Sequence, residues 1–480
     1  MLSYSVVMNR LLSSLCPPWV REVPFRTIWD LVWPQMSMLL CTIVISLTDI
    51  WAAGQLSAGI QAAVGLTFQV QTLLLVFGWA LGSGSMAAVT QSMGGGKPGR
   101  ARNYVSFVLA ACVGIALAVA CIVYLLRRPV LILIQTPEAL MPVTEYILGV
   151  MLLGLPAYYT GQVAGTLFRA ARQVMAPLFV VMISCLLNIF GDLCLGLGWL
   201  GFPAWGMKGI VWSSFGANVA AALLSVHFLQ RGGLLADHLV PPLRWLRKGA
   251  PYLFRVAIPA GINSMLWQAG YLVMYSITAS LPDGVDALAG LTAGNRIESL
   301  LYMPATAFMV TASILVGNAL GAGDKLAAKR AGITLFVLAA VSMSSVAACM
   351  WPFIPDLARF FSGEAAVQRQ IVNYLFFNVL VVPFTVSGMV LNGVMNGAGA
   401  TVYSMIVNVS CIWLIRLPVG WVLAHLVFHD ACGVYMAMFL SMAVQTSLMF
   451  WVFQRKDWTR FALNARHTAA HRTAALKEEA

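Results

Sequence analysis

Charge is scarce in this sequence. Only 10% of the 480 residues are Asp, Glu, Lys or Arg, against about 25% in an ordinary soluble domain. By contrast, 60% of the residues are hydrophobic, and the mean hydropathy is +0.83. A water-soluble fold cannot bury that much apolar surface and still present a charged exterior. Soluble enzymes, disordered tails and disulfide scaffolds are therefore excluded, and the sequence predicts a polytopic membrane protein.

Motifs for cofactors, metals and nucleotides are also missing. The nine Cys include no C-x-x-C pair, so they are expected to pack as small apolar residues rather than as disulfides or metal ligands. The run Gly94-Gly95-Gly96-Lys97-Pro98 lacks the G-x-x-x-x-G-K-[ST] pattern of a phosphate-binding loop. The net charge of +12 is explained by basic cytoplasmic loops. We expect no cofactor, no nucleic-acid partner and no enzymatic activity.

What the sequence has in abundance is long apolar runs. A helix needs about 20 apolar residues to cross the hydrocarbon of a bilayer. Because the runs are continuous rather than alternating, they indicate helices and not the strands of a barrel. We count twelve spans, at about 28–51, 61–92, 104–126, 143–165, 176–197, 209–229, 256–280, 288–318, 332–351, 371–392, 402–425 and 432–454.

The basic residues predict the orientation of these spans. With the N-terminus in the cytoplasm, 22 of the 29 basic residues fall in inside segments and 5 in outside segments, and Arg296 and Arg416 lie within spans. This asymmetry follows the positive-inside rule and places both termini in the cytoplasm. The predicted division is an N-terminal segment (1–27), a six-helix bundle (28–229), a linker (230–255), a second six-helix bundle (256–454) and a basic tail (455–480).

The two halves of the sequence resemble each other. Pro34 aligns with Pro259 at an offset of 225, and after an insertion of two residues Pro156 aligns with Pro383 at an offset of 227. Six spans repeated in the same orientation form a parallel repeat, related by an axis along the membrane normal. The expected fold is all-α, with twelve transmembrane helices in two pseudo-symmetric six-helix bundles that face a central cavity.

Short motifs in this order resemble those of the multidrug and toxic compound extrusion (MATE) family, within the multidrug/oligosaccharidyl-lipid/polysaccharide exporter superfamily. The resemblance extends from about Arg26 to Gln454. The motifs that carry it are Thr48-Asp49-Ile50, Gly54-Gln55-Leu56, Gln91 with Gly94-Gly95-Gly96, Arg296-Ile297-Glu298-Ser299, Val316-Gly317-Asn318, Leu320-Gly321-Ala322-Gly323-Asp324 and Asn396-Gly397-Ala398-Gly399-Ala400-Thr401. The resemblance implies a secondary active transporter.

Two acids lie inside spans of the first bundle, where an ionisable side chain costs a few kcal/mol. Asn188 and Asp192 are spaced i, i+4 on one face of span 5, and Asp49 lies at a similar depth in span 1. Together they are suited to taking up H⁺ or Na⁺; the alternative is that both acids cap helix ends. By resemblance, Asp49, Asn188 and Asp192 match a cation site of the family. Some members carry a Tyr one turn before the span 1 acid, where this chain has Ile45. The resemblance therefore does not decide between H⁺ and Na⁺ as the coupling ion.

The second bundle offers different polar groups. Glu298 lies in span 8, two residues after Arg296, and can pair either with Arg416 of span 11 or with a cationic substrate. Gln268 is a polar residue of span 7, and Trp267 begins an i, i+4, i+8 aromatic stripe with Tyr271 and Tyr275. Such a stripe either packs against neighbours or lines a pocket for cations.

Proline interrupts the hydrogen bonding of span 1. Pro34 lies fifteen residues before Asp49, and a proline within a helix produces a kink. By resemblance, bending at this proline accompanies cation binding. The alternative is a static kink that shapes the cavity.

The predicted function is export of an organic, cationic drug or metabolite in exchange for H⁺ or Na⁺ by alternating access. The predicted partners are a small organic substrate and the lipid of a bacterial inner membrane, and we expect a monomer. One alternative is a flippase for lipid-linked oligosaccharide, which the shortage of basic residues within spans disfavours. Another is a passive membrane scaffold, which has no use for buried acids.

Overall fold

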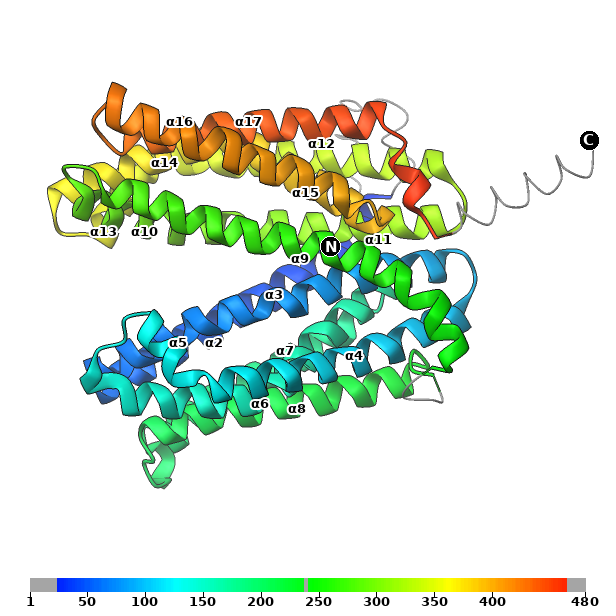
Figure 1. Cartoon of the computed structure of the whole chain (residues 1–480), viewed down its shortest axis with the longest axis horizontal. Coiled ribbons are helices and arrows are strands. Elements are labelled where there is room, and N and C mark those ends of the chain that lie inside the picture. Colours follow the sequence, from blue (N-terminus) through cyan, green and yellow to red (C-terminus); the bar gives the residue numbers. More distant parts are fainter. Residues whose placement is uncertain (1–23, 237–240, 464–480) are drawn as a thin grey trace, which may run out of the picture. The chain divides into compact units, whose positions relative to one another are not determined.

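The computed structural model describes residues 24–236 and 241–463, and helices are the regular structure found there (Figure 1). Helices satisfy every backbone polar group within one segment, which the interior of a bilayer requires. The chain divides into two compact units. We call residues 33–257 the N-terminal unit, and residues 258–463 together with residues 24–32 the C-terminal unit.

The N-terminal unit is built around α6, which packs against α3, α4 and α8, while α7 packs against α8. At Asp192 the α-helix α7 passes into a π-helical turn, η3 (Asp192–Gly196). The helices of this part of the chain are α2 (Phe25–Leu56), α3 (Ala58–Gly94), α4 (Pro98–Leu125), α5 (Arg127–Leu133), α6 (Met141–Ala170), α7 (Met175–Gly191) and α8 (Met207–Arg231).

The C-terminal unit is built in the same way around α14, which packs against α10, α11, α12 and α17. A Cβ at Gly393 or Gly397 of α14 would overlap the backbone of α11, so these glycines allow two helices to approach closely. The helices of residues 241–463 are α9 (Leu243–Ala279), which begins in the N-terminal unit, α10 (Gly284–Leu301), α11 (Met303–Gly321), α12 (Lys325–Met350), α13 (Ile354–Phe361), α14 (Ala365–Ala398), α15 (Thr401–Ser410), α16 (Leu417–Val422) and α17 (Cys432–Arg455), with π-helical turns η6 (Cys411–Arg416) and η7 (Leu423–Val427).

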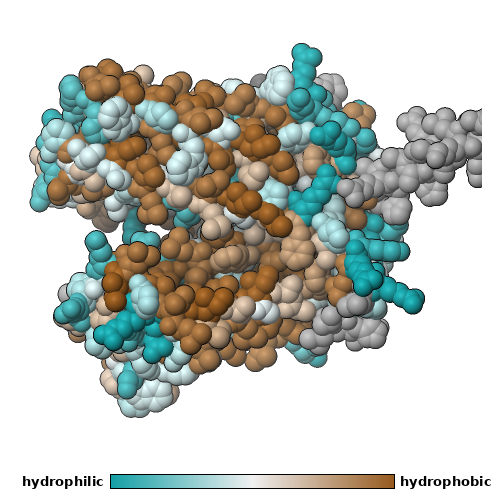
Figure 2. Space-filling model, in the orientation of Figure 1, coloured by the Kyte–Doolittle hydropathy of each residue, from teal (hydrophilic) through white to brown (hydrophobic). Residues whose placement is uncertain are grey.

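Apolar side chains cover the flanks of these helices, and hydrophilic residues gather at their ends (Figure 2). Large apolar side chains on these helices are more than half exposed, for example Leu47, Leu223, Leu272 and Val341. Exposed apolar surface on this scale needs a hydrophobic surrounding rather than water. Within the described residues, eleven helices are long and apolar enough to cross a membrane.

Two of the predicted spans differ from the observed helices. The span expected at 256–280 belongs to α9, which begins earlier, at Leu243, and is not among the eleven apolar candidates. Its first turns carry four basic residues, namely Arg244, Arg247, Lys248 and Arg255. The span expected at 288–318 is two helices, because α10 ends at Leu301 and α11 begins at Met303. Pro304, in the first turn of α11, explains the break, since proline favours a helix start and disrupts a helix interior.

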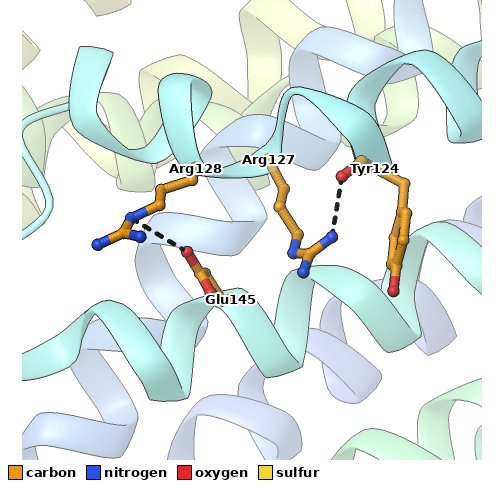
Figure 3. A network of polar contacts seen from close by, with 4 residues as sticks. All are labelled: Tyr124, Arg127, Arg128 and Glu145. Atoms are coloured by element: carbon orange, nitrogen blue, oxygen red, sulfur yellow. Dashed lines mark hydrogen bonds and ion pairs between the residues drawn. The ribbon is translucent and has the colours of Figure 1, made fainter.

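Two short helices display the internal repeat most directly. α5 begins at position 127 and α13 at position 354, so they are 227 residues apart, the offset that aligns Pro156 with Pro383. Each precedes the central helix of its unit and packs against it. In α5, Arg127 donates to the carbonyl oxygen of Tyr124 at 3.1 Å, and Arg128 Nε lies 4.0 Å from Glu145 Oε1 of α6 (Figure 3). Arg127 thus links α5 to the end of α4, and Arg128 lies beside α6 at an exposed position, where an ion pair contributes little to stability.

Candidate coupling and substrate sites

Asp192 is the most deeply buried acid of the N-terminal unit, with no exposed surface. Its Oδ1 accepts a hydrogen bond from the Ser213 hydroxyl of α8 at 2.8 Å. The same hydroxyl lies 3.0 Å from the backbone carbonyl oxygen of Asn188. A Cβ at Gly191 would lie 2.6 Å from Ser213 Cβ, so glycine at this position lets α7 approach α8 closely enough for the contact.

Asp49 reaches the same place from α2. Its Oδ1 lies 3.4 Å from the Ser214 hydroxyl, which in turn accepts from Asn188 Nδ2 at 3.0 Å. The carboxyl groups of Asp49 and Asp192 are within hydrogen-bonding reach of each other. The structure therefore brings together all three residues that the sequence singled out in this unit, from α2 and α7.

Ser213 and Ser214 complete this cluster, and the sequence analysis missed them. Their signal was a pair of adjacent hydroxyls in an otherwise apolar stretch of α8. Serine in a membrane helix often bonds to the carbonyl of its own preceding turn, so such a pair does not by itself indicate a site. We name Asp49, Asn188, Asp192, Ser213 and Ser214 the acid cluster.

The acid cluster has more hydrogen-bond acceptors than donors. Within the described residues, Asp192 Oδ2 and Asn188 Oδ1 are buried and no donor reaches them. A buried polar atom without a partner costs free energy, and an ionised carboxylate offers only acceptors. A proton or a small cation with a preference for oxygen ligands would satisfy these atoms. The π-helical turn that begins at Asp192 is a feature found frequently at functional sites.

In the C-terminal unit, Glu298 of α10 accepts a hydrogen bond from the hydroxyl of Tyr374 of α14. The side chain of Asn378, one turn further along α14, also lies within reach of this carboxyl group. A Cβ at Gly294, one turn before Glu298, would collide with the ring of Tyr374. Glycine at that position therefore lets the tyrosine lie against α10.

Arg416 is the last residue of the π-helical turn η6 and is 2% exposed. Its Nε donates to Ser441 Oγ of α17 at 2.9 Å. The guanidinium carbon lies 5.3 Å from the ring centre of Trp267 and 5.9 Å from that of Tyr271. Such distances are those of cation–π contacts.

Glu298 and Arg416 line one small cavity, of about 20 Å³. That volume accommodates about one water molecule, and not an organic substrate. The cavity lies inside the C-terminal unit, and its other lining residues are Tyr271, Tyr374, Phe377, Asn378, Val381, Thr385, Tyr435, Met438, Phe439 and Met442. Within the described residues no ion pair of 4.0 Å or less joins Glu298 to Arg416. The sequence suggested that Glu298 can pair with Arg416. In the structure, Tyr374 is the hydrogen-bond partner of Glu298, and Ser441 is the hydrogen-bond partner of Arg416.

The remaining predicted residues lie apart from this cavity or at its edge. Arg296 is exposed on α10, because a separation of two residues turns it to a different face from Glu298. Gln268 is half-buried on α9 and does not line the cavity. Trp267 does not line the cavity either, but it contacts two residues that do, Arg416 and Tyr271. The sequence missed Tyr374 and Ser441.

Pro34 is buried within α2, which continues without interruption from Phe25 to Leu56. The boundary between the two units falls between Val32 and Trp33, directly before this proline. The second boundary falls between Ala257 and Ile258, directly before Pro259 of α9. Both long helices thus change unit beside one of the two prolines that the internal repeat aligns.

The MatE family model matches residues 34–193 and 259–422 of this chain. The chain belongs to the MATE family. The two matched ranges begin at Pro34 and Pro259, so the family model recognises each half separately, at the offset of 225 found within the sequence. Members of this family are multidrug and toxic compound efflux transporters, not enzymes, and the chain is an integral, multi-pass membrane protein.

Known proteins resemble this MATE chain over nearly its whole length. It is 27% identical to a probable multidrug resistance protein, NorM, of Thermotoga maritima, over 93% of this chain and 96% of that protein. It is 22% identical to the probable multidrug resistance protein YoeA of Bacillus subtilis, over 89% and 96%. The crystal structure of a mutant of the Vibrio cholerae MATE transporter VcmN superposes with a TM-score of 0.83 at 18% identity, over 90% of this chain and 98% of that one. This likeness confirms the predicted fold of twelve helices in two bundles.

Proposed function

We propose that this MATE protein is a secondary active exporter that exchanges H⁺ or Na⁺ for an organic, cationic drug or metabolite by alternating access. The observation that carries the proposal is the acid cluster of the N-terminal unit, where Asp49 and Asp192 approach each other inside the hydrophobic part of the protein. A transporter that uses an ion gradient needs a group that gains and loses a cation. Two facing carboxyl groups can gain and lose a cation in this way.

The cluster acts through the charge of its carboxyl groups. When both are ionised they repel each other, and the repulsion is strong where water is scarce. One proton shared between them, or one Na⁺ held by carboxylate, amide and hydroxyl oxygens, removes that repulsion. The bound cation draws α2 toward α7, and its loss releases α2. Cation binding therefore biases the N-terminal unit between two shapes.

α2 is suited to such movement. Among the eleven candidate spans its apolar window has the smallest buried share, 17%. The helix is fixed near its C-terminal end, where Ala52 and Ala53 pack against Ile210 of α8. Asp49 lies one turn before this contact, so a change in its charge acts on α2 beside the point where the helix is packed.

The C-terminal unit supplies the second polar site. Glu298 gives it a negative charge and Trp267 and Tyr271 give it aromatic faces, which together suit an organic cation. In this conformation the cavity is too small for such a molecule, so we propose that the substrate enters only when the helices around it separate. Arg416 balances the charge of Glu298 while the site is closed.

The bacterial relatives support a bacterial inner membrane as the location. The orientation with both termini in the cytoplasm rests on the distribution of basic residues. We propose a monomer, since one chain contains both units and both polar sites.

The proposal is tested with purified protein in liposomes loaded with a fluorescent organic cation. An imposed proton gradient and an imposed Na⁺ gradient are applied separately, so that each ion is tested without the other. Acceleration of dye movement by one gradient, abolished in Asp49→Asn, supports the proposal and identifies the ion. Dye movement that neither gradient changes would contradict it. Movement of a fluorescent lipid-linked oligosaccharide instead of the dye would favour the flippase.

A further inference from the structure

Two thiols meet between the same helices that carry the acid cluster. Cys41 lies on α2 and Cys185 on α7, and neither is part of a disulfide. Cys185 Sγ lies 3.7 Å from the carbonyl oxygen of Cys41, and the two thiol groups are within hydrogen-bonding reach of each other. The thiol of Cys185 therefore lies against Cys41, and a disulfide between the two residues would form where α2 and α7 already touch.

The position of this pair relates it directly to the acid cluster. Cys41 precedes Asp49 by eight residues and Cys185 precedes Asp192 by seven. At 1.5 Å of rise per residue, both separations correspond to about 11 Å along a helix. The thiols therefore form a second point of approach between α2 and α7, about two turns away from the acids.

The middle of α2 is exposed on one face and packed on another. Beside Cys41, Leu40 is 55% exposed and Val44 38% exposed, whereas Met38 is buried. The packed contact of Ala52 and Ala53 with Ile210 lies three turns away. A covalent bond at Cys41 would thus add a fixed attachment to a stretch of α2 that is partly exposed.

We propose that Cys41 and Cys185 are a redox modification site, at which a peroxide forms a disulfide that ties α2 to α7 and stops transport. The inference that transport stops rests on the proposed function, whereas the disulfide itself does not. Hydrogen peroxide is small and uncharged, and it reaches thiols that charged oxidants do not.

The chemistry proceeds in two balanced steps. The sulfur of Cys41, which is the more exposed of the two, attacks one peroxide oxygen; the O–O bond breaks, a sulfenic acid forms and water is released once the thiol proton is transferred. Cys185 then attacks the sulfenic sulfur, and the hydroxyl leaves as a second water. Two thiols have lost two electrons and two protons, and one peroxide has become two waters. A dithiol reductant reverses the modification by exchange.

The test uses full-length protein in which the two exposed cysteines within the described chain, Cys121 and Cys349, are replaced by Ser, so that surface oxidation does not interfere. After treatment with hydrogen peroxide, free thiols are alkylated and the digest is searched by mass spectrometry for a peptide pair joined through Cys41 and Cys185. The pair should form in this background and in Cys112→Ser, a buried thiol of α4 that serves as the matched control. It should be lost in Cys41→Ser and in Cys185→Ser.

Transport is measured on the same samples. Peroxide should reduce efflux in proportion to the linked fraction, dithiothreitol should restore it, and both serine variants should resist peroxide. Absence of the linked peptides would overturn the modification site, and linked protein that still transports at the full rate would overturn its effect on α2. If the reduced protein shows no gradient-driven efflux but the linked peptides form, the proposed function fails and the modification site stands.

Discussion

Tyr374 donates its hydroxyl hydrogen to Glu298, joining α14 to α10 at the position where the sequence offered Arg416 as the partner. Arg416 is held instead by Ser441 and by the rings of Trp267 and Tyr271. The acid and the base of the C-terminal unit therefore belong to one cavity but have separate partners. This arrangement changes what mutations there should do.

We predict that Glu298 is energetically coupled to Tyr374 more strongly than to Arg416. Groups in direct contact show coupling energies of about 0.5–3 kcal/mol in double-mutant cycles, and groups without contact show less. The cycles combine Glu298→Gln with Tyr374→Phe and, separately, with Arg416→Gln, and thermal unfolding in detergent is the measurement. A larger coupling energy in the cycle of Glu298 and Arg416 would contradict this prediction and indicate a direct ion pair between the two residues.

We expect Asp49→Asn and Asp192→Asn each to abolish efflux driven by an ion gradient, while the protein still folds and inserts. The amide keeps the size of the carboxyl group but cannot exchange a proton or offer negative charge to Na⁺. Asn188→Ala should weaken coupling less, because it removes one ligand and no charge. Efflux in proteoliposomes and substrate binding in detergent are measured together. Gradient-driven efflux at the normal rate in the double variant of Asp49 and Asp192 would contradict this prediction. Glu298 would then be the next candidate for the residue that binds the coupling cation.

Ser213 should matter although it carries no charge. Ser213→Ala removes the donor to Asp192 Oδ1, and a hydrogen bond to a charged group contributes about 1.5–3 kcal/mol. The loss destabilises the ionised cluster, so we expect cation affinity to change by roughly tenfold or more, since about 1.4 kcal/mol corresponds to a factor of ten. Ser225→Ala, at a buried serine about three turns further along α8, is the control and should leave the ion dependence of efflux unchanged. Equal effects of the two variants would contradict a specific role for Ser213.

The orientation is tested by labelling single cysteines in a variant without native cysteines. A membrane-impermeant reagent applied from outside should label positions 283 and 430, and should leave positions 98 and 327 unlabelled until the membrane is opened. These pairs lie at opposite ends of the predicted spans. Labelling of position 98 from outside would reverse the proposed orientation.

Most of the fold could be predicted from the sequence because its signals are local. Long apolar runs and the aligned prolines predicted the helices and the repeat, and scarce intramembrane acids drew attention to Asp49 and Asp192. The break at Tyr302 was missed because Pro304 lies in an unbroken apolar run, where composition alone does not show on which side of a proline a helix stops.

The hydrogen-bond partners of the buried charged side chains could not be predicted in the same way. Ser213, Tyr374 and Ser441 reach their partners from helices that are 21 to 76 residues away in sequence. Serine and tyrosine are common in membrane helices, so only the packing of α8, α14 and α17 shows which of them are used. The preference for Tyr374 over Arg416 as the partner of Glu298 is decided by distance in the fold.

The placement of the unit boundaries beside Pro34 and Pro259 limits which parts of this gene can be exchanged by recombination. Residues 24–32 are part of the C-terminal unit, and residues 243–257 are part of the N-terminal unit. A recombination event between α8 and α9 would therefore replace pieces of both units at once, and each foreign piece would have to fit a core that evolved with another. The two halves resemble each other in sequence, but each supplies a segment to the other's unit, so a change in one half has to remain compatible with the other.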